Sequence, residues 1–245
     1  MAIIQGSFYS ETLHRLTNYT AILPDADYEE VTVMYLLHGR SGDCRSWLNQ
    51  TRISSYVSKI PLVVFCPEVG LSCYSNMAFG GNYQDFLEKE FPKKMKQFHS
   101  YKVYQTVVSG NSMGGYGALK WALAEPERFD LIGLLSPLAD LRSLWSIYPE
   151  SMKEFQAVFQ SEELYEGSEN DLFTVLVNTE KNSLPPIIHS CGEQDFLHPD
   201  NLKLQKVLAP VSQNYQYNFS GGDHNWNEWD QRIQDIIEYL KQSGG

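Results

Sequence analysis

The sequence is poor in positive charge and contains no long hydrophobic run. Lys and Arg total 19 against 30 Asp and Glu, which gives a net charge of −11. A protein of this charge is repelled by nucleic-acid phosphates and by anionic lipid headgroups. The longest apolar runs, residues 31–37 and 61–67, are much shorter than the roughly 20 residues of a membrane-spanning helix. We therefore expect neither nucleic acid nor a membrane as a partner.

Cysteine is also scarce, and no secretion signal is recognisable. The four cysteines, Cys44, Cys66, Cys73 and Cys191, form no C-x-x-C pair and no spacing typical of a zinc site. Residues 1–10 have neither the basic segment nor the apolar segment of a signal peptide. We therefore expect a cytoplasmic protein with free, mostly buried thiols and no bound metal.

The remaining composition is that of an ordinary globular protein. Hydrophobic residues make up 42%, aromatic residues 13% and charged residues 20%, which excludes a disordered, collagen-like or coiled-coil chain. The 245 residues contain no repeat and no Ser/Gly-rich linker, so we expect one domain over residues 1–245.

Short apolar runs alternate with helical stretches along the chain. This alternation predicts an α/β protein with a mainly parallel sheet flanked by helices. Residues 12–23 have the pattern of an antiparallel edge hairpin. The expected strands are 31–37 and 62–66, both buried, followed by 105–109, 131–135, 187–191 and an alternating last strand at 215–219. The main expected helices are 82–98, 113–124 and 227–240.

About fifty residues separate two of these strands, 131–135 and 187–191, and this is longer than an ordinary connection. Residues 155–164 and 171–177 within it are expected to be helical. We interpret residues 137–185 as a small cap inserted over a pocket, with an elaborated crossover as the alternative. Four aromatic residues of this segment either line an acyl pocket or pack in the core: Trp145, Tyr148, Phe155 and Phe159.

The motif G-x-S-x-G occurs at Gly110, Ser112 and Gly114, directly after an expected strand and at the start of an expected helix. In this setting the motif forms a sharp turn that lifts the serine hydroxyl above the sheet. The residues two before and two after the serine must be small to let the chain turn. Ser112 is therefore the candidate nucleophile.

A serine hydroxyl needs a neighbouring base, and hydrolases with this motif carry Ser, then an acid, then His along the chain. His224 lies in a Gly-rich loop between the last strand and the last helix, and we expect it to be the base. His198, expected in a loop near the pocket, is the alternative. His189 lies inside an expected strand and is read as a core residue.

The acid is expected from the loop after strand 187–191. The candidates there are Glu193, Asp195 and Asp200, and Asp195 is preferred because its turn is long enough to direct a carboxylate towards the histidine. Asp223 adjoins His224 and is read as a turn residue.

A tetrahedral intermediate also needs backbone N–H donors. We assign these to Met113, which follows the nucleophile, and to Arg40 in the loop after strand 31–37, with Ser41 as the alternative to Arg40. The guanidinium of Arg40 is expected to be solvated, the alternative being contact with an anionic group of the substrate.

At these motifs the chain resembles the esterase D-like branch of the α/β-hydrolases, which includes S-formylglutathione hydrolases, feruloyl and acetylxylan esterases and tributyrin esterases. The matching stretches are LLHG (36–39), YQDF (83–86), GNSMGG (110–115), GEQD (192–195) and GDHNW (222–226). The resemblance implies the α/β-hydrolase fold and family roles for Ser112, Asp195 and His224. It is strongest to the tributyrin-type short-chain esterases, and by analogy alone it allows a homo-oligomer.

The sequence thus predicts a serine carboxylesterase that hydrolyses small acyl esters through an acyl-enzyme intermediate, without a cofactor. The first alternative is thioester hydrolysis of the S-formylglutathione type or acyl transfer on the same scaffold. Peptide hydrolysis and a non-catalytic binding module are the remaining alternatives.

Overall fold

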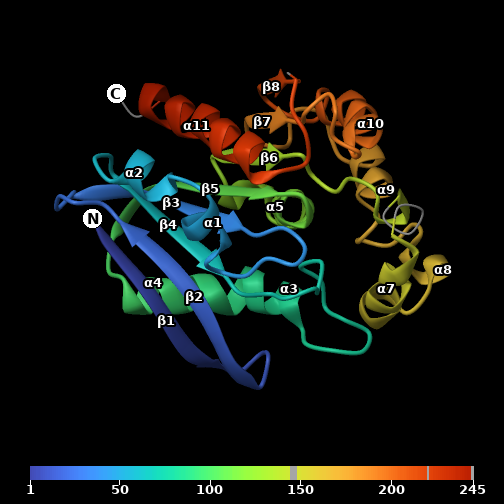
Figure 1. Ribbon diagram of the computed structural model, residues 1–245, viewed down its shortest axis with the longest axis horizontal. Helices are drawn as coiled ribbons and strands as arrows, with labels where there is room; N and C mark the ends of the chain where they lie inside the picture. The colour runs from blue at the N-terminus through green and yellow to red at the C-terminus, as the bar shows by residue number, and fades with distance from the viewer. Residues whose placement is uncertain (144–147, 220, 244–245) are drawn as a thin grey trace.

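A computed structural model describes residues 1–143, 148–219 and 221–243 of the chain. Its centre is an eight-stranded sheet in the order β1-β2-β4-β3-β5-β6-β7-β8 (Figure 1). β2 pairs antiparallel with β1 and with β4, and all the other pairs are parallel. The strands are β1 (Ala2–Ser10), β2 (Arg15–Leu23), β3 (Glu30–Leu37), β4 (Leu62–Pro67), β5 (Lys102–Asn111), β6 (Leu131–Leu135), β7 (Ile187–Ser190) and β8 (Tyr215–Asn218).

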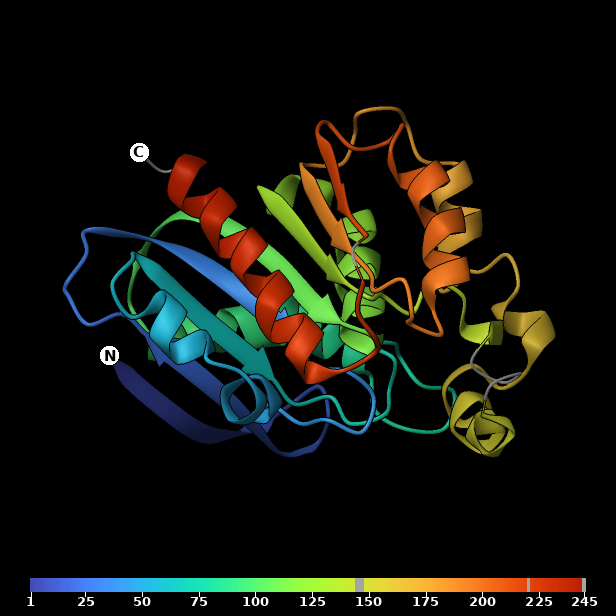
Figure 2. The same ribbon diagram turned by 45° about the horizontal axis from the view of Figure 1, so that its top comes forward.

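Helices cover both faces of this sheet (Figures 1 and 2). One face packs against α1 (Ser46–Gln50), α2 (Ile53–Val57) and the long α11 (Trp226–Ser243). The elements on the other face are α3 (Tyr83–Asp85), the π-helical turn η1 (Phe86–Glu90), α4 (Phe91–Phe98), α5 (Met113–Ala124), α9 (Leu172–Val177) and α10 (His198–Leu208). The remaining short elements are η2 (Pro126–Arg128), η3 (Pro149–Ser151), α7 (Met152–Phe159) and α8 (Glu162–Tyr165). Of the helices in the described ranges, none has the length and apolar character needed to cross a bilayer.

Helical spacing of apolar residues explains how α11 covers its face. Ile233, Ile236 and Ile237 recur on one side of the helix and are almost fully buried. Gly133 of β6 allows the close approach, since a Cβ atom there would lie 2.3 Å from Ile236 Cδ1. The four cysteines are free thiols as expected, and Cys73 alone among them is partly exposed.

The predicted fold class is confirmed: the sheet is mainly parallel and lies between helices. Three local expectations were wrong. The edge hairpin includes β1, so it spans residues 2–23 rather than 12–23. The helix expected at 155–164 is divided, because Gln160 at φ 69° ends α7 and the Ser161 side chain caps α8. His198 begins a helix, α10, in which Pro199 occupies the first turn, where its missing N–H costs no hydrogen bond.

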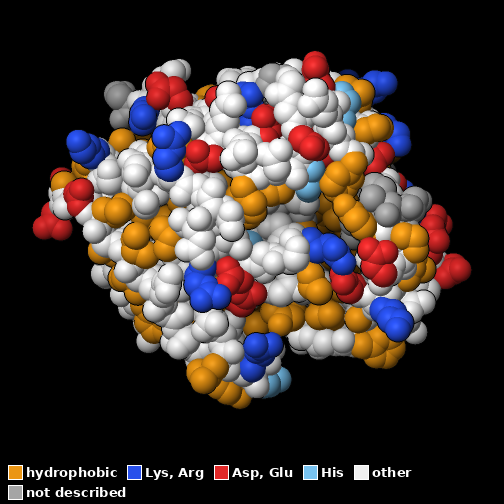
Figure 3. Space-filling model, viewed as in Figure 1, with side chains coloured by type: hydrophobic (Ala, Val, Ile, Leu, Met, Phe, Trp, Pro, Cys, Tyr) orange, Lys and Arg blue, Asp and Glu red, His pale blue; other side chains and the backbone are white. Residues whose placement is uncertain are grey.

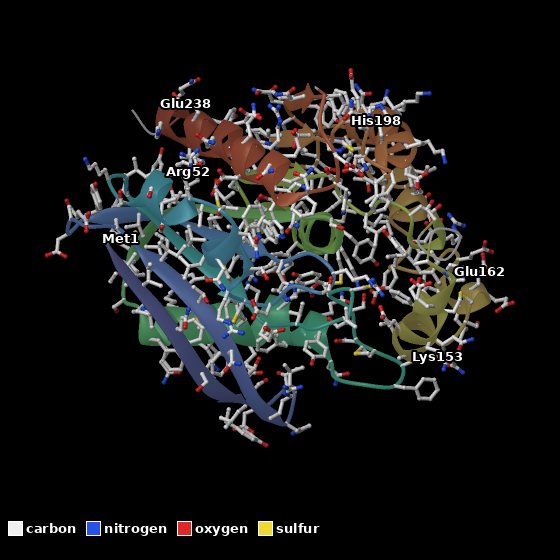
Figure 4. All side chains as sticks on the ribbon, in the orientation of Figure 1. Met1, Arg52, Lys153, Glu162, His198 and Glu238 are labelled. Atoms are coloured by element: carbon white, nitrogen blue, oxygen red, sulfur yellow. The ribbon has the colours of Figure 1, made fainter. Side chains whose placement is uncertain are left out.

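The parallel strands place their following loops at one edge of the sheet. β3, β5, β6, β7 and β8 run in the same direction, so the segments after residues 37, 111, 135, 190 and 218 meet there. Ligands of open α/β sheets bind at this carboxyl edge. The helices of residues 149–177 lie beyond it, with Lys153 of α7 and Glu162 of α8 at the outer margin (Figure 4).

The start of α5 is packed against the end of β3 with no room for a side chain. A Cβ atom on Gly114 would lie 2.3 Å from the carbonyl oxygen of Leu37, and one on Gly110 would lie 2.5 Å from the carbonyl group of Gly114. Real Cβ atoms do not approach backbone atoms so closely, so both positions require glycine.

We expect Gly114→Ala to lower the free energy of unfolding by about 1–3 kcal/mol, because the added methyl group must displace backbone. Helix propensity alone predicts the opposite effect, a gain in stability, because Ala is favoured over Gly in a helix. Urea denaturation measures the change in stability. Gly221→Ala is the control, because a Cβ there has no atom of the described residues within 4 Å apart from its neighbours in the chain. Equal stability of Gly114→Ala and the wild type would contradict this account of the packing.

Candidate active site

Ser112 lies in a strained turn between β5 and α5. Its backbone has φ 54° and ψ −119°, in the region that residues other than glycine rarely adopt. Three hydrogen bonds hold it there: its amide donates to Leu135 O over 2.9 Å, and its carbonyl accepts from the amides of Tyr116 (3.1 Å) and Leu138 (3.0 Å). The expectation of a tight turn at this serine is met.

The Ser112 hydroxyl lies within hydrogen-bond distance of His224. The distance between Ser112 Oγ and His224 Nε2 is 3.0 Å, and His224 Nδ1 lies 2.8 Å from Asp195 Oδ2. An ionised Asp195 can only accept a hydrogen bond, so Nδ1 carries the proton and Nε2 is free to accept from the serine. The structure thus brings together the three residues that the sequence singled out.

Asp195 is buried, with its side chain inaccessible to solvent. Its second oxygen, Oδ1, accepts a hydrogen bond of 2.8 Å from the Leu197 amide. Burial by itself raises the pKa of this carboxyl, but the hydrogen bond and charge of His224 and the Leu197 amide act in the opposite direction. The net result is a pKa below its ordinary value of 3.8, so Asp195 is ionised at neutral pH.

The loops that carry the acid and the histidine touch through their backbones. The Gln194 amide donates to Gly222 O over 2.9 Å. A Cβ atom on Gly192 would lie 2.3 Å from that same oxygen, so the contact requires glycine. This contact fixes the spacing between Asp195 and His224.

Aromatic side chains enclose the imidazole of His224. The ring of Phe196 lies 4.5 Å from it, centroid to centroid, and the ring of Trp229 lies 4.9 Å away at right angles. Sequence reasoning missed both contacts. Phe196 follows the acid directly and Trp229 lies one helical turn after the histidine loop, but nothing in the pattern says that either faces the imidazole.

The alternative residues lie elsewhere. His189 is fully buried and bonded to Tyr215 and Asn201, as expected of a core residue. His198, labelled in Figure 4, has its Nδ1 3.0 Å from Gly192 O in the acid loop. Asp200 pairs with Lys203 and Glu193 is exposed, so neither meets the histidine ring. Asp223 accepts from the backbone amide of His224, which is a turn contact.

The loop after β3 lies beside Ser112. A Cβ atom on Gly39 would be 3.4 Å from Ser112 Cβ. The indole N–H of Trp47 donates to Leu37 O and the Tyr74 hydroxyl donates to His38 O, which holds the start of this loop. In the described part of the chain, the amides of Arg40 and Met113 have no protein acceptor. They are therefore available to an acceptor on a bound molecule.

The Arg40 side chain differs from both expectations for it. Its guanidinium is neither simply solvated nor directed at a substrate anion, but forms two hydrogen bonds with the carboxylate of Glu154 on α7, at 2.9 and 2.8 Å. The sequence gives no sign of this pairing, because 114 residues separate the partners.

A hollow of about 480 Å³ opens over Ser112 and His224. Its lining includes the loop of residues 39–42, the polar side chains of Ser46 and Gln50, and the aromatic rings of Tyr148, Phe196 and Trp226. The face drawn in Figure 3 is hollowed near its centre, where histidine atoms are visible beside hydrophobic side chains.

The other aromatic residues expected at an acyl pocket have different positions. Phe155 lines a smaller cavity next to the hollow, and Phe159 is buried against Phe155 and Tyr165. Trp145 lies outside the described residues. Within the described ranges, no three His, Cys, Asp or Glu side chains gather in a way that could hold a metal ion.

Comparison with known proteins gives consistent matches. Residues 10–240 match a family described as "Putative esterase". The chain is 29% identical to an acetyl esterase of Caldicellulosiruptor saccharolyticus, over 99% of each protein. Two solved structures from Staphylococcus aureus are each 29% identical, with 98% of both chains covered: the fluorophosphonate-binding serine hydrolase FphF at a TM-score of 0.88, and the S-formylglutathione hydrolase FrmB at 0.85.

These matches span nearly the whole chain, and the fold agrees with them over the same length. The chain belongs to the esterase family and is a carboxylic ester hydrolase with the α/β-hydrolase fold.

Proposed function

We propose that the protein is a serine carboxylesterase that hydrolyses short-chain acyl esters with Ser112, His224 and Asp195 as its catalytic triad. The observation that carries this proposal is the unbroken hydrogen-bond chain from Ser112 Oγ through both ring nitrogens of His224 to Asp195. In this state the imidazole is poised to take the serine proton.

The reaction proceeds in two halves. Ser112 Oγ attacks the ester carbonyl as His224 Nε2 takes its proton, and the tetrahedral oxyanion accepts hydrogen bonds from the amides of Met113 and Arg40. His224 then protonates the leaving alcohol and the acyl group stays on Ser112. Water then attacks the acyl carbonyl as His224 takes its proton, and His224 returns that proton to Ser112 Oγ as the bond to the acyl group breaks and the acid leaves. Asp195 keeps the imidazole in its tautomer and stabilises the imidazolium throughout.

We further propose that residues 137–185 cap this site within a single domain over residues 1–245. Leu138 and Tyr148 of the segment line the hollow over Ser112, and Glu154 binds the loop that supplies the Arg40 amide. A cap in this position limits the size of the acyl group and shields the acyl-enzyme from bulk water.

Thioester hydrolysis is a second candidate, favoured by the similarity to the S-formylglutathione hydrolase FrmB. The same triad serves both reactions, because a thiolate leaves more readily than an alkoxide. Comparison of kcat/KM on p-nitrophenyl acetate and on S-formylglutathione separates them. A large preference for the thioester would displace the carboxylesterase proposal.

Ser112→Ala is expected to lower kcat for p-nitrophenyl acetate by about 10³-fold or more, because no other group can form the acyl-enzyme. Ser55→Ala, at an exposed serine of α2, is the matched control and should keep full activity. A fluorophosphonate probe should label the wild type and the control but not Ser112→Ala. Equal hydrolysis by Ser112→Ala and the wild type would refute the proposed nucleophile.

Replacing His224 and His198 separately shows which of the two histidines is the catalytic base. His224→Ala should reduce kcat by about 10³-fold or more, because the serine then lacks a base. His198→Ala should keep kcat within about threefold of the wild-type value, because the His198 ring bonds to the carbonyl oxygen of Gly192 in the acid loop and not to Ser112. Steady-state hydrolysis of p-nitrophenyl acetate checks both, and the opposite ranking would make His198 the base.

The lowered pKa of Asp195 predicts a pH-dependent stability. The unfolded chain binds a proton at this carboxyl near 3.8, whereas the folded protein binds it only at lower pH. The ionised carboxylate therefore stabilises the fold above pH 3.8, and this contribution is lost as the pH falls through the folded pKa.

Urea denaturation of wild type and Asp195→Asn between about pH 6 and pH 3 tests this expectation. The excess in free energy of unfolding of the wild type over Asp195→Asn should shrink as the pH approaches 3. Glu193→Gln, which alters an exposed carboxylate of the same loop, is the control. A stability difference for Asp195→Asn that stays constant down to pH 3 would argue against an ionised, histidine-bound Asp195.

A further inference from the structure

A second, smaller cavity adjoins the hollow over Ser112. Arg40 and Leu138 line both spaces. The other described residues that line the small cavity are Met113, Leu141 and Phe155, with Leu71, Cys73, Ser151 and Glu154. Its apolar lining from Met113, Leu141 and Phe155 is almost entirely buried. The centre of a water-sized sphere can move within about 20 Å³ of it. The hollow over Ser112 and His224 measures about 480 Å³ in the same way, so the small cavity suits a short acyl group and not a bulky one.

The geometry of ester cleavage assigns different parts of the substrate to the two spaces. His224 must protonate the leaving alcohol, so the alcohol lies in the hollow that His224, Asn225 and Trp226 line. Among the described residues, none from the histidine loop or the acid loop lines the small cavity. Met113, whose amide faces the oxyanion in the proposed reaction, is one of its lining residues. The acyl chain is the remaining substituent of the carbonyl carbon, and it extends into the small cavity.

The ion pair of Arg40 and Glu154 forms the outer part of this cavity. Their side chains are 30% and 34% exposed, whereas Leu138 and Leu141 opposite them are 3% and 1% exposed. The two hydrogen bonds between guanidinium and carboxylate are parallel, an arrangement that fixes both side chains in one plane. The guanidinium also lies 5.9 Å from the ring centroid of Tyr148, at the border with the hollow.

We propose that the Arg40–Glu154 ion pair determines acyl chain length, by closing the acyl cavity so that it accepts short acyl groups and excludes longer chains. The inference rests on the proposed function, since it requires an acyl group on Ser112. Glu154 touches neither the reacting atoms nor the triad, so it is a specificity-determining residue. Without its carboxylate, Arg40 is free to turn into solvent and the cavity opens at the surface.

The test is the ratio of kcat/KM for p-nitrophenyl acetate to kcat/KM for p-nitrophenyl hexanoate. Hexanoate has four methylenes more than acetate, and each one that the cavity cannot accept costs about tenfold or more. Exclusion of at least two of them gives the wild type a preference for acetate of at least about 100-fold. Glu154→Ala should reduce this ratio by about tenfold or more. A general loss of activity, as from a loosened Arg40 loop, lowers both rates and cancels in the ratio.

Gln156→Ala is the matched control, because Gln156 is an exposed residue of the same helix and loses the same length of side chain. It should keep the wild-type ratio. Glu154→Gln retains the shape of the side chain but removes its charge, and it replaces Glu154→Ala if circular dichroism shows that the latter is unfolded. Its ratio should lie below that of the wild type.

The outcomes separate the two proposals. If Ser112→Ala is inactive but the wild type hydrolyses hexanoate as well as acetate, or the Glu154 variants keep the wild-type ratio, the inference is overturned and the proposed function stands. If Ser112→Ala is as active as the wild type, the proposed function itself fails, and the inference fails with it. A lowered ratio confined to the Glu154 variants supports both, whereas an unchanged or raised ratio overturns the inference.

Discussion

The backbone conformation of Ser112 is the constraint on which the rest of the site depends. A serine at φ 54° is strained, and it persists because Leu135, Leu138 and Tyr116 bond its amide and carbonyl. These partners come from the end of β6, the segment after it and the first turn of α5. The central strands of the sheet therefore hold the turn in place. Gly114 is required because the first turn of α5 packs against the carbonyl oxygen of Leu37, where a side chain has no room.

The other parts of the site reach Ser112 because parallel strands end together. β7 and β8 lie at one side of the sheet, and their following loops return towards β5 carrying Asp195 and His224. The contact between Gly192 and Gly222 connects these two loops through their backbones. The hydrogen bonds of 3.0 and 2.8 Å hold Ser112, His224 and Asp195 in one arrangement, and such preorganisation is what electrostatic catalysis relies on.

Much of the fold and of the candidate site could be predicted from the amino-acid sequence. The bounds expected for β6 and α5 agree with the structure, because an apolar run bounded by turn residues and a Gly/Ala-rich helix have clear local signals. Ser112, Asp195 and His224 could be chosen because each follows a recognisable strand. The division between α7 and α8 could not be predicted, since a positive φ at Gln160 leaves no mark on the hydrophobic pattern.

By itself, the sequence determined the fold class, the strands from β3 to β8, and the loops on which the three chemical groups stand, because these follow from local periodicity and from the G-x-S-x-G turn. Only the tertiary structure decided that Arg40 pairs with Glu154, that Phe196 and Trp229 enclose His224, and that a small cavity lies behind Met113. These contacts join segments far apart in the chain. Which residues meet in these contacts depends on how the loops and helices pack. Packing depends on distances in space, which no local pattern of residues encodes.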